Sequence, residues 1–287
     1  MEAGDPCVDL RRIMVYRVYI PGSPLSDFVD KFWSEEGYAP SHARERALPT
    51  GTTELIFNLL DDEMRVFDRQ DPDRPRRFRG ALICGAHSGY FVIDTAQQSS
   101  TIGVHFKPGG AFPFFGLPAH ELRNAHVSLD ALWGPNADEL RDRLLEAGTP
   151  AARFRILEQA LLAHVEKPLA RHPAVAYALR EFYGVRHTRT ISEVTDRVGL
   201  SHRRFVQVFS EEVGLTPKLF CRVRRFQEVV RLIESREQVE WAEVALGAGY
   251  FDQAHFIHDF RAFSGLTPTA YLAQRGERLN HVPLRER

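Results

Sequence analysis

One unit of sequence occurs twice between residues 191 and 271, and this repeat restricts the fold more strongly than any other feature. At an offset of 51 residues, the matching pairs are Phe205 and Phe256, Phe209 and Phe260, Gly214 and Gly265, Leu215 and Leu266, Thr216 and Thr267, and Pro217 and Pro268. Upstream, Ile191, Val194 and Gly199 reappear 50 residues later as Trp241, Val244 and Gly249. Two copies are too few to stack into a solenoid, so the repeat indicates a different architecture.

Each copy predicts two short helices joined by a turn. In the first copy, apolar residues at helical spacing end at Gly199, where a left-handed residue closes a helix, and Ser201 caps the next helix. Gly249 and Asp252 take the same places in the second copy. Two short helices around a turn of three or four residues are what a DNA-reading helix-turn-helix requires. The alternative is a helical hairpin that serves only for packing.

The segment between the two copies predicts one continuous helix. From Pro217 to about Glu234 there is no glycine and no further proline, and an apolar stripe continues at helical spacing. Such a helix is roughly 27 Å long, and successive major grooves on one side of DNA are ~34 Å apart. We therefore expect a rigid spacer that places two reading helices about one turn of DNA apart.

These residues carry a resemblance to a known family. The pattern is Ile191-x-x-Val194-Thr195, Gly199-Leu200-Ser201, Phe205, Phe209, Gly214-Leu215-Thr216-Pro217, Arg225-Phe226, Gly249-Tyr250-x-Asp252-Gln253-x-His255-Phe256, Phe260, Gly265-Leu266-Thr267-Pro268 and Tyr271. It resembles the DNA-binding domain of the AraC/XylS family of bacterial transcription regulators. Thr195 departs from the alanine that is usual there. The resemblance implies a sequence-specific transcription regulator that reads two successive major grooves.

The resemblance also implies which residues contact DNA. Base contacts fall to His202, Arg203, Val206 and Gln207 in the first unit and to Gln253, Ala254, Ile257 and His258 in the second. Phosphate contacts are expected from Ser201, Arg204, Lys218, Arg225 and Arg261. Arg203 suits guanine and Gln207 suits adenine, whereas Ala254 offers only apolar contact. His258 stands where the family often has arginine. The alternative is that these are merely solvated polar residues.

Charge differs between the two units, although the whole chain has a net charge of only -1. Between Ser201 and Leu232 the basic residues are Arg203, Arg204, Lys218, Arg222, Arg224, Arg225 and Arg231, against Glu211, Glu212 and Glu228. Near the second reading helix, Asp252 and Asp259 oppose Arg261. We therefore expect the two units to bind DNA unequally.

The rest of the chain predicts an α+β protein. Strand-like runs lie at 15–20, 54–60, 64–67, 79–83, 90–93 and 101–106, and helical spacing follows at 129–133, 136–147, 150–166 and 172–183. We expect a β-rich sensor-like domain over 1–118, a helical linker and dimerisation region over 119–183, and an all-α domain of two helix-turn-helix units over 184–275.

The β-rich part resembles the sensor domain found ahead of some AraC-type domains. The matching motifs are Leu48-Pro49-x-Gly51-x-x-Glu54-Leu55-Ile56-Phe57-Asn58-Leu59 and Gly103-Val104-x-Phe106-x-Pro108-Gly109-Gly110. The resemblance implies a small-molecule or protein effector, beside double-stranded DNA, RNA polymerase and a second copy of the chain as partners. No cofactor and no membrane are expected.

Three polar residues of this domain are candidates for effector binding: Glu54, His87 and His105. Glu54 and His105 lie in apolar strand-like runs, where a polar group needs a partner or a cavity. The alternative is that His105 faces solvent and that Glu54 pairs with an arginine such as Arg46. No H-x-H or HExxH spacing is present, so we expect no metal site.

Enzymatic classes find little support. The motifs GxSxG, Walker A and GxGxxG are absent. A methyl-accepting cysteine of DNA repair is one alternative, but Cys7, Cys84 and Cys221 lack the surroundings expected of such a nucleophile, and we expect reduced thiols. A pure interaction protein is another. Residues 1–10 lack the apolar core of a signal peptide, which favours a cytoplasmic protein.

Overall fold

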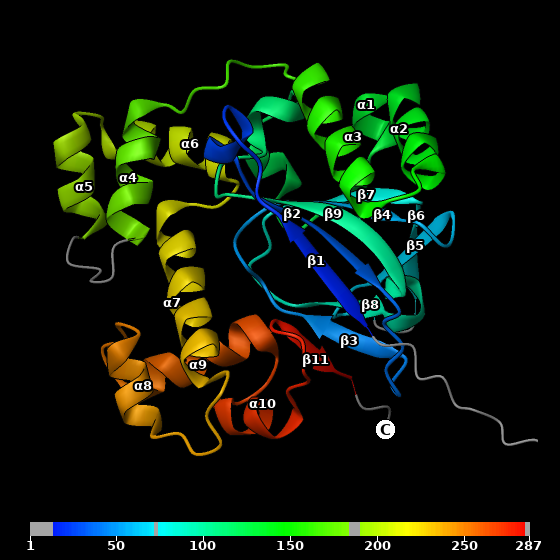
Figure 1. The fold of residues 1–287 in the computed structure, drawn as a ribbon. Coiled ribbons are helices and arrows are strands. Elements are labelled where there is room, and N and C mark those ends of the chain that lie inside the picture. The colour runs from blue at the N-terminus through cyan, green and yellow to red at the C-terminus, as the bar shows by residue number, and fades with distance from the viewer. Residues whose placement is uncertain (1–13, 72–73, 184–189, 285–287) are drawn as a thin grey trace, which may run out of the picture.

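The computed structural model describes residues 14–71, 74–183 and 190–284 (Figure 1). The strands are β1 (Val15–Tyr19), β2 (Val29–Glu36), β3 (Arg44–Ala47), β4 (Glu54–Asn58), β5 (Glu63–Phe67), β6 (Pro75–Arg79), β7 (Ala81–Cys84), β8 (Phe91–Asp94), β9 (Ser100–Phe106), β10 (His126–Ser128) and β11 (His281–Pro283). The helices are α1 (Asp130–Trp133), α2 (Pro135–Glu146), α3 (Pro150–Ala163), α4 (Pro173–Tyr183), α5 (Ile191–Val198), α6 (His202–Val213), α7 (Pro217–Ile233), α8 (Trp241–Gly247), α9 (Gln253–Ser264) and α10 (Pro268–Gln274). Cys7 and the segment 1–10 lie outside the described residues.

The strands form two antiparallel sheets, which confirms the predicted β-rich N-terminal part. One sheet has the order β1-β2-β9-β4-β7-β10, and the other has the order β11-β3-β8-β5-β6. The runs predicted at 54–60, 90–93 and 101–106 correspond to β4, β8 and β9. The run predicted at 79–83 was wrong at its start, because Gly80 separates β6 from β7 and these strands belong to different sheets.

Helices α1, α2 and α3 cover the outer face of the six-stranded sheet (Figure 1). The core between them is apolar, and Phe57 and Val104 from the sheet lie in it with Leu144 and Leu157 from the helices. All four side chains are almost completely buried. Burial of this kind stabilises by about 25 cal/mol per Å² of apolar surface, so this face of the sheet is fixed in place by its helices.

The helices α4 to α10 share a second core, and the predicted tandem helix-turn-helix arrangement is confirmed. Gly199, Gly214 and Gly265 end α5, α6 and α9 in the left-handed conformation, with φ of 69°, 89° and 73°. Ser201 and Asp252 cap α6 and α9 by accepting hydrogen bonds from backbone amides. Helix α4 packs into this same core through its apolar face. The boundaries expected at 118, 183 and 275 stay predictions.

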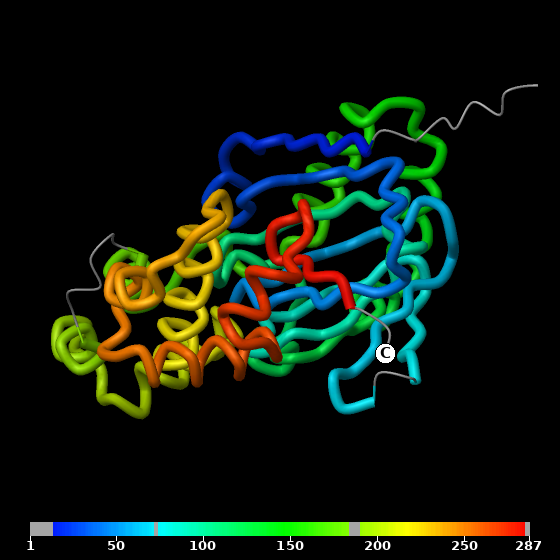
Figure 2. Tube along the Cα trace, turned by 90° about the horizontal axis from the view of Figure 1, so that it is seen from below, coloured from blue at the N-terminus to red at the C-terminus, as the bar shows by residue number. Residues whose placement is uncertain are grey.

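The helical core meets the β-rich part along α7 and the C-terminal segment. Strand β11 pairs with β3, so the chain returns to the five-stranded sheet after α10 (Figure 2). Val282 of β11 and Leu48 beside β3 are buried in the helical core. Gln227 of α7 donates hydrogen bonds to the Pro49 carbonyl (2.8 Å) and to Asn280 Oδ1 (2.9 Å). The helical part is therefore attached to the β-rich part at more than its N-terminal end.

Helices long and apolar enough to cross a membrane do not occur in the described part of the chain.

Candidate DNA-reading helices and an inter-sheet cavity

The first helix expected to read DNA is α6, and its first two turns are open to solvent. His202, Arg203 and Gln207 are exposed and Val206 is half-buried, because Phe205 and its neighbours on the opposite face fill the core. Ser201 Oγ accepts a hydrogen bond from the backbone N of Arg204 at 3.3 Å and so holds the start of the helix. The helix therefore presents the residues that the sequence assigns to base contacts.

Helix α9 has the same arrangement in the second unit. Gln253, Ala254 and His258 are exposed and Ile257 is half-buried. Asp252 Oδ1 accepts a hydrogen bond from the backbone N of His255 at 2.7 Å, which again fixes the first turn. Both units thus leave the same helix positions uncovered, although each helix is anchored on its apolar side.

Four of the five residues expected to contact phosphate are exposed: Ser201, Arg204, Lys218 and Arg261. The fifth, Arg225, is half-buried, and its guanidinium lies 5.3 Å from the centre of the Tyr250 ring. A guanidinium at this distance from an aromatic face makes a cation–π contact. Arg225 therefore contributes to the packing between α7 and the second unit.

The charge count near the second reading helix was wrong in one respect. Asp259 does not oppose Arg261, because its side chain is only 1% exposed and accepts hydrogen bonds from Arg222 at 2.6 and 3.2 Å. Such a bidentate pair is among the stronger ionic contacts in proteins. The pair removes one expected anion from the second unit and one expected cation from the first, and it joins α7 to α9.

The C-terminal ends of both reading helices contact the β-rich part. A Cβ on Gly214, after α6, would lie 3.1 Å from the Ala119 carbonyl and 3.3 Å from the Ala86 side chain. After α9, the ring of Tyr90 packs directly on Gly265, and the Tyr90 amide donates a hydrogen bond to the Phe263 carbonyl at 2.8 Å. The segment 85–90 therefore contacts both helix-turn-helix units at once.

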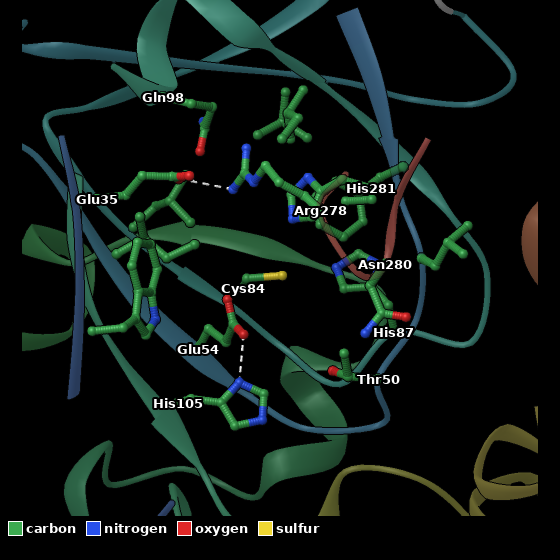
Figure 3. Close-up of a pocket in the computed structure, with 18 of the residues that line it drawn as sticks. Glu35, Thr50, Glu54, Cys84, His87, Gln98, His105, Arg278, Asn280 and His281 are labelled. Carbon is green, nitrogen blue, oxygen red and sulfur yellow. Dashed lines mark hydrogen bonds and ion pairs between the residues drawn. The ribbon is translucent and has the colours of Figure 1, made fainter. Parts of the chain in front are cut away.

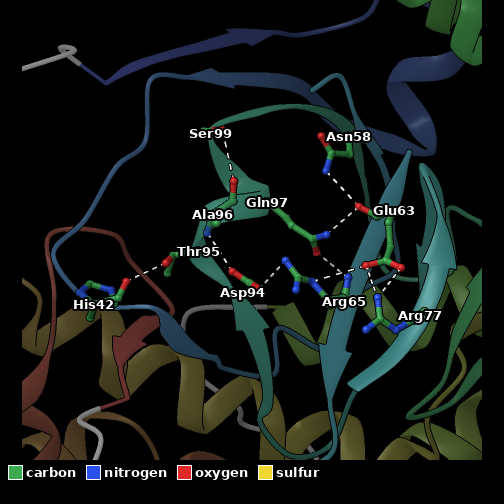
Figure 4. Close-up of polar contacts among 10 residues, drawn as sticks. All are labelled: His42, Asn58, Glu63, Arg65, Arg77, Asp94, Thr95, Ala96, Gln97 and Ser99. Carbon is green, nitrogen blue, oxygen red and sulfur yellow. Dashed lines mark hydrogen bonds and ion pairs between the residues drawn. The ribbon is translucent and has the colours of Figure 1, made fainter. Parts of the chain in front are cut away.

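Between the two sheets lies a cavity of about 440 Å³ (Figure 3). Side chains from both sheets line it, and so do Arg278, Asn280 and His281 from the C-terminal segment. At one end, the turn between β8 and β9 crosses from one sheet to the other, and the Gln97 side chain bonds to the backbone of Glu63 and Arg65 in β5 (Figure 4). The cavity is large enough for a small organic molecule.

A row of polar side chains crosses the six-stranded sheet on its cavity face. Neighbouring strands pair His126 with Cys84, Cys84 with Glu54, Glu54 with His105, and His105 with Lys31. All five residues line the cavity. Because residues paired directly across antiparallel strands share a face, the row is a consequence of register. Of its members, the sequence indicated only Glu54 and His105.

Glu54 and His105 form an ion pair within this row, with 2.5 Å between Oε1 and Nδ1. Burial alone raises the pKa of Glu54, but the hydrogen bond and charge of His105 outweigh it and leave that pKa below its usual value. The alternative considered from the sequence was wrong on both points, because His105 faces the cavity and Arg46 lies over the Tyr90 ring instead of beside Glu54. The flanking Val104 and Phe106 are buried on the other face.

A second charged cluster joins the C-terminal segment to the cavity. Arg278 forms ion pairs with Glu35 of β2 (2.9 Å) and Glu45 of β3 (3.6 Å), and His281 Nδ1 lies 3.0 Å from Glu45. Both carboxylates are buried. Tyr38 also donates a hydrogen bond to Glu45. Sequence reasoning missed this cluster, and its signal is the run Arg44-Glu45-Arg46 inside a strand.

Glu45 makes stability depend on pH. Burial alone raises its pKa, but hydrogen bonds from His281, Tyr38 and His42 lower it to about 2 from 4.5. A lowered carboxyl pKa contributes stability that is complete above the unfolded value and is lost as the pH falls toward the folded one. At neutral pH we expect the free energy of unfolding of Glu45→Gln to be about 3 kcal/mol lower than that of the wild type. This difference should disappear as the pH falls from 4.5 to 2.

The measurement is urea unfolding of the two proteins at several pH values. The comparison is made in a Glu35→Gln background, because the charge of Glu45 also raises the pKa of Glu35 and this effect does not cancel in the difference. A difference in unfolding free energy that stays constant between pH 7 and pH 3 would contradict the assignment.

Comparison with known families gives two matches. Residues 17–128 match a family described as a domain of unknown function (DUF6597), and residues 194–274 match a family described as a helix-turn-helix domain. Among curated proteins, none matches the chain.

Among solved structures, the chain is similar to ToxT from Vibrio cholerae, with a TM-score of 0.46 and 7% identity over 91% of this chain and 98% of that one. It is also similar to ToxT from strain O395 bound to (E)-4-(8-methylnaphthalen-1-yl)but-3-enoic acid, with a TM-score of 0.45 and 8% identity over 91% and 98%. Unsaturated fatty acid bound ToxT from strain SCE256 gives a TM-score of 0.43 and 9% identity over 90% and 94%.

A helix-turn-helix domain in which α6 and α9 expose one face to solvent is the arrangement of a DNA-binding transcription regulator. The match to a helix-turn-helix domain over residues 194–274 agrees with the resemblance of this part of the sequence to the AraC type.

Proposed function

We propose that this regulator reads two successive major grooves with α6 and α9. The observation that carries the proposal is the matched exposure of the same positions in both helices, each behind a capped first turn. Helix α7 separates the two units (Figure 1), and its 17 residues span about 26 Å. The base-contacting residues are those that the family resemblance implied, at 202, 203, 206 and 207 and at 253, 254, 257 and 258.

Selection of bound DNA from a random duplex pool, at one stated salt concentration, tests this proposal. We expect an asymmetric motif of two blocks about one helical turn apart. The selection is repeated with a protein that is mutated in α9. If both proteins select the same symmetric motif, the proposal that α6 and α9 read different sequences would be contradicted. If no sequence is enriched, either with or without candidate effectors, the proposal that this protein is a sequence-specific regulator would be contradicted.

The Arg203→Ala substitution should weaken binding by about 1–3 kcal/mol and relax the preference at one base pair. Arg203 is exposed on α6, so its loss removes a base contact and leaves the core intact. The matched control is Arg204→Ala, next in the chain and also exposed. That variant should weaken all sequences alike and reduce the salt slope by about one. Identical sequence profiles for the two variants would show that Arg203 contacts no base.

We further propose that an effector binds in the inter-sheet cavity and changes DNA binding. The cavity offers the ionic groups of Glu54, His105 and Arg278 beside apolar walls from Trp33 and Met64. Because Arg278 and His281 follow α10 directly, a ligand that contacts them also contacts the DNA-binding part. A ligand that prefers one arrangement of that segment shifts the equilibrium between DNA-bound and free protein.

The direct measurement is a screen of small molecules for an increase in unfolding temperature, followed by DNA titration with each hit. Glu54→Gln should weaken the hits that bind in the cavity, whereas Glu121→Gln, on the exposed surface, should leave them unchanged. If the binding of the hits is unaffected by Glu54→Gln and by other substitutions in the cavity, the effector binds elsewhere.

We propose that the chain acts by binding and not by catalysis. Burial raises the pKa of Cys84 well above its usual value and raises that of Cys221 to about 11. A thiol that stays protonated is a poor nucleophile, which disfavours the methyl-accepting alternative.

RNA polymerase and a second copy of the chain are the further partners that we propose. A regulator of chromosomal DNA in a bacterium works in the cytoplasm, where we place it.

A further inference from the structure

Three side chains that can bind a metal ion converge at one end of the cavity. Cys84 ends β7, His87 follows three residues later, and His126 of β10 is the cross-strand partner of Cys84. One donor atom from each residue lies within 4.8 Å of the other two. All three residues are buried. Register and a short connection therefore bring together residues that are 42 positions apart in the chain.

The two imidazoles have buried nitrogen atoms with no partner. His87 Nε2 and His126 Nε2 are both inaccessible to solvent and without a hydrogen bond. The Ala125 carbonyl accepts a hydrogen bond from the His87 ring, and Phe91 packs against both rings at 4.6 and 4.5 Å between centres. A backbone carbonyl on one ring nitrogen is the usual way to fix a metal-binding histidine. A buried nitrogen that has no hydrogen-bond partner is otherwise destabilising.

The donor set indicates the class of metal. Thiolate and imidazole suit Zn²⁺ and disfavour Mg²⁺ and Ca²⁺, which prefer oxygen. Zn–S and Zn–N bonds of ~2.3 and ~2.1 Å place donors around one tetrahedral ion roughly 3.5 Å apart. The donor atoms lie within 4.8 Å of one another, so they need to approach by at most about 1.3 Å to reach this distance, a shift within the range of side-chain rotation.

We propose that Cys84, His87 and His126 bind a zinc-like divalent ion whose fourth position opens into the cavity. Binding converts the Cys84 thiol to a thiolate and releases its proton to solvent, and both histidines bind as neutral rings. Glu54 stands next to Cys84 in the polar row, so an exchangeable ligand at the fourth position lies against the Glu54–His105 pair. The expectation from the sequence that the chain holds no metal rested on motif spacing, which overlooks donors joined by sheet register.

The site also lies beside the DNA-reading helices. His87 belongs to the segment 85–90, where Ala86 packs against Gly214 after α6 and Tyr90 contacts Phe263 and Gly265 at the end of α9. A metal that holds His87 against β10 therefore restricts the segment that contacts both units. This consequence rests on the proposed DNA-reading function, whereas the metal site itself does not.

Cobalt(II) is the probe that tests the site, because a cobalt–thiolate bond gives a charge-transfer absorption that imidazole alone does not. The reduced full chain should bind one Co²⁺ with this absorption, and Zn²⁺ should displace it. Cys84→Ser should abolish the absorption, and Cys221→Ser, which removes the half-buried thiol of α7, should retain it. Absence of the absorption in the wild type, or its loss in Cys221→Ser, would overturn the proposal.

Histidine variants keep the test decisive if Cys84→Ser does not fold. His87→Gln and His126→Gln should each weaken Co²⁺ binding at least about tenfold while the thiolate absorption persists at saturation. Unchanged affinity in both folded variants would overturn the site.

A separate titration with DNA tests the coupling. Zn²⁺ should change the DNA affinity of the wild type by about fivefold or more, and this change should disappear in His87→Gln. Metal binding without any change in DNA affinity would overturn the coupling between the metal site and DNA binding, but it would not contradict the metal site itself. Failure to bind DNA with or without metal would instead contradict the proposed reading function.

Discussion

Arg278→Ala should lower the free energy of unfolding by about 3–5 kcal/mol, because it leaves the buried carboxylate of Glu35 without its cation and removes one of the partners of Glu45. Glu35 and Glu45 are almost completely buried, and the Arg278 side chain is 16% exposed between them. Burial raises the pKa of Glu35 even though the charge of Arg278 lowers it, so loss of the arginine should raise this pKa further. Urea unfolding followed by circular dichroism measures the change.

The control is Glu277→Ala, next to Arg278 but exposed, which should change stability by less than about 0.5 kcal/mol. The double variant Glu35→Gln with Arg278→Ala should recover part of the loss, since the one carboxylate that remains, Glu45, keeps its hydrogen bonds from His281, Tyr38 and His42. Equal losses in the single and double variants would show that the ion pairs do not carry the effect.

Val223→Pro should cost ~3 kcal/mol or more and remove the preference for DNA that carries both blocks. Val223 lies fully buried in the middle of α7. Proline there removes a backbone hydrogen bond and clashes with the carbonyl four residues earlier, so the spacer bends. The measurement compares affinities for DNA with one block and with two blocks, below the unfolding temperature of the variant.

Val223→Ala is the control, because it trims the same side chain but keeps the helix straight. Helix α7 packs against α6, α8 and α9, and Val223 also contacts Gly51 of the β-rich part, so both substitutions destabilise the core. Only the proline should abolish the gain from the second block. A retained gain in Val223→Pro would contradict a role for α7 as a rigid spacer.

The helical half could be predicted from the sequence because its signals are local. Capping residues, glycine stops and apolar spacing lie within one or two turns of the positions that they determine, and the repeat presents each signal twice. Thus the left-handed Gly199 and Gly265 and the caps at Ser201 and Asp252 follow from short windows of sequence. The second role of Gly265, close contact with the Tyr90 ring, depends on a residue 175 positions away and was not predictable.

Strands β2 and β3 were missed for a related reason. Their charged residues look unsuited to a buried strand, but Glu35 and Glu45 are buried against Arg278, more than 200 residues later in the chain. The cavity could not be predicted for the same reason. Alternation correctly placed Val104 and Phe106 on a buried face, yet it could not distinguish a cavity from solvent on the face of His105. Cys84 and His126 become neighbours only through strand register.

The return of the chain to β11 has a consequence for how such regulators can be recombined. A DNA-binding module joined by one linker can be exchanged between proteins by a single cut. Here the polypeptide that carries α5 to α10 ends by supplying an edge strand to the five-stranded sheet, together with Arg278 and His281 in the cavity wall. A chimera cut near residue 183 would therefore import part of the donor's cavity along with the donor's reading helices, so specificity for DNA and the shape of the cavity are inherited together.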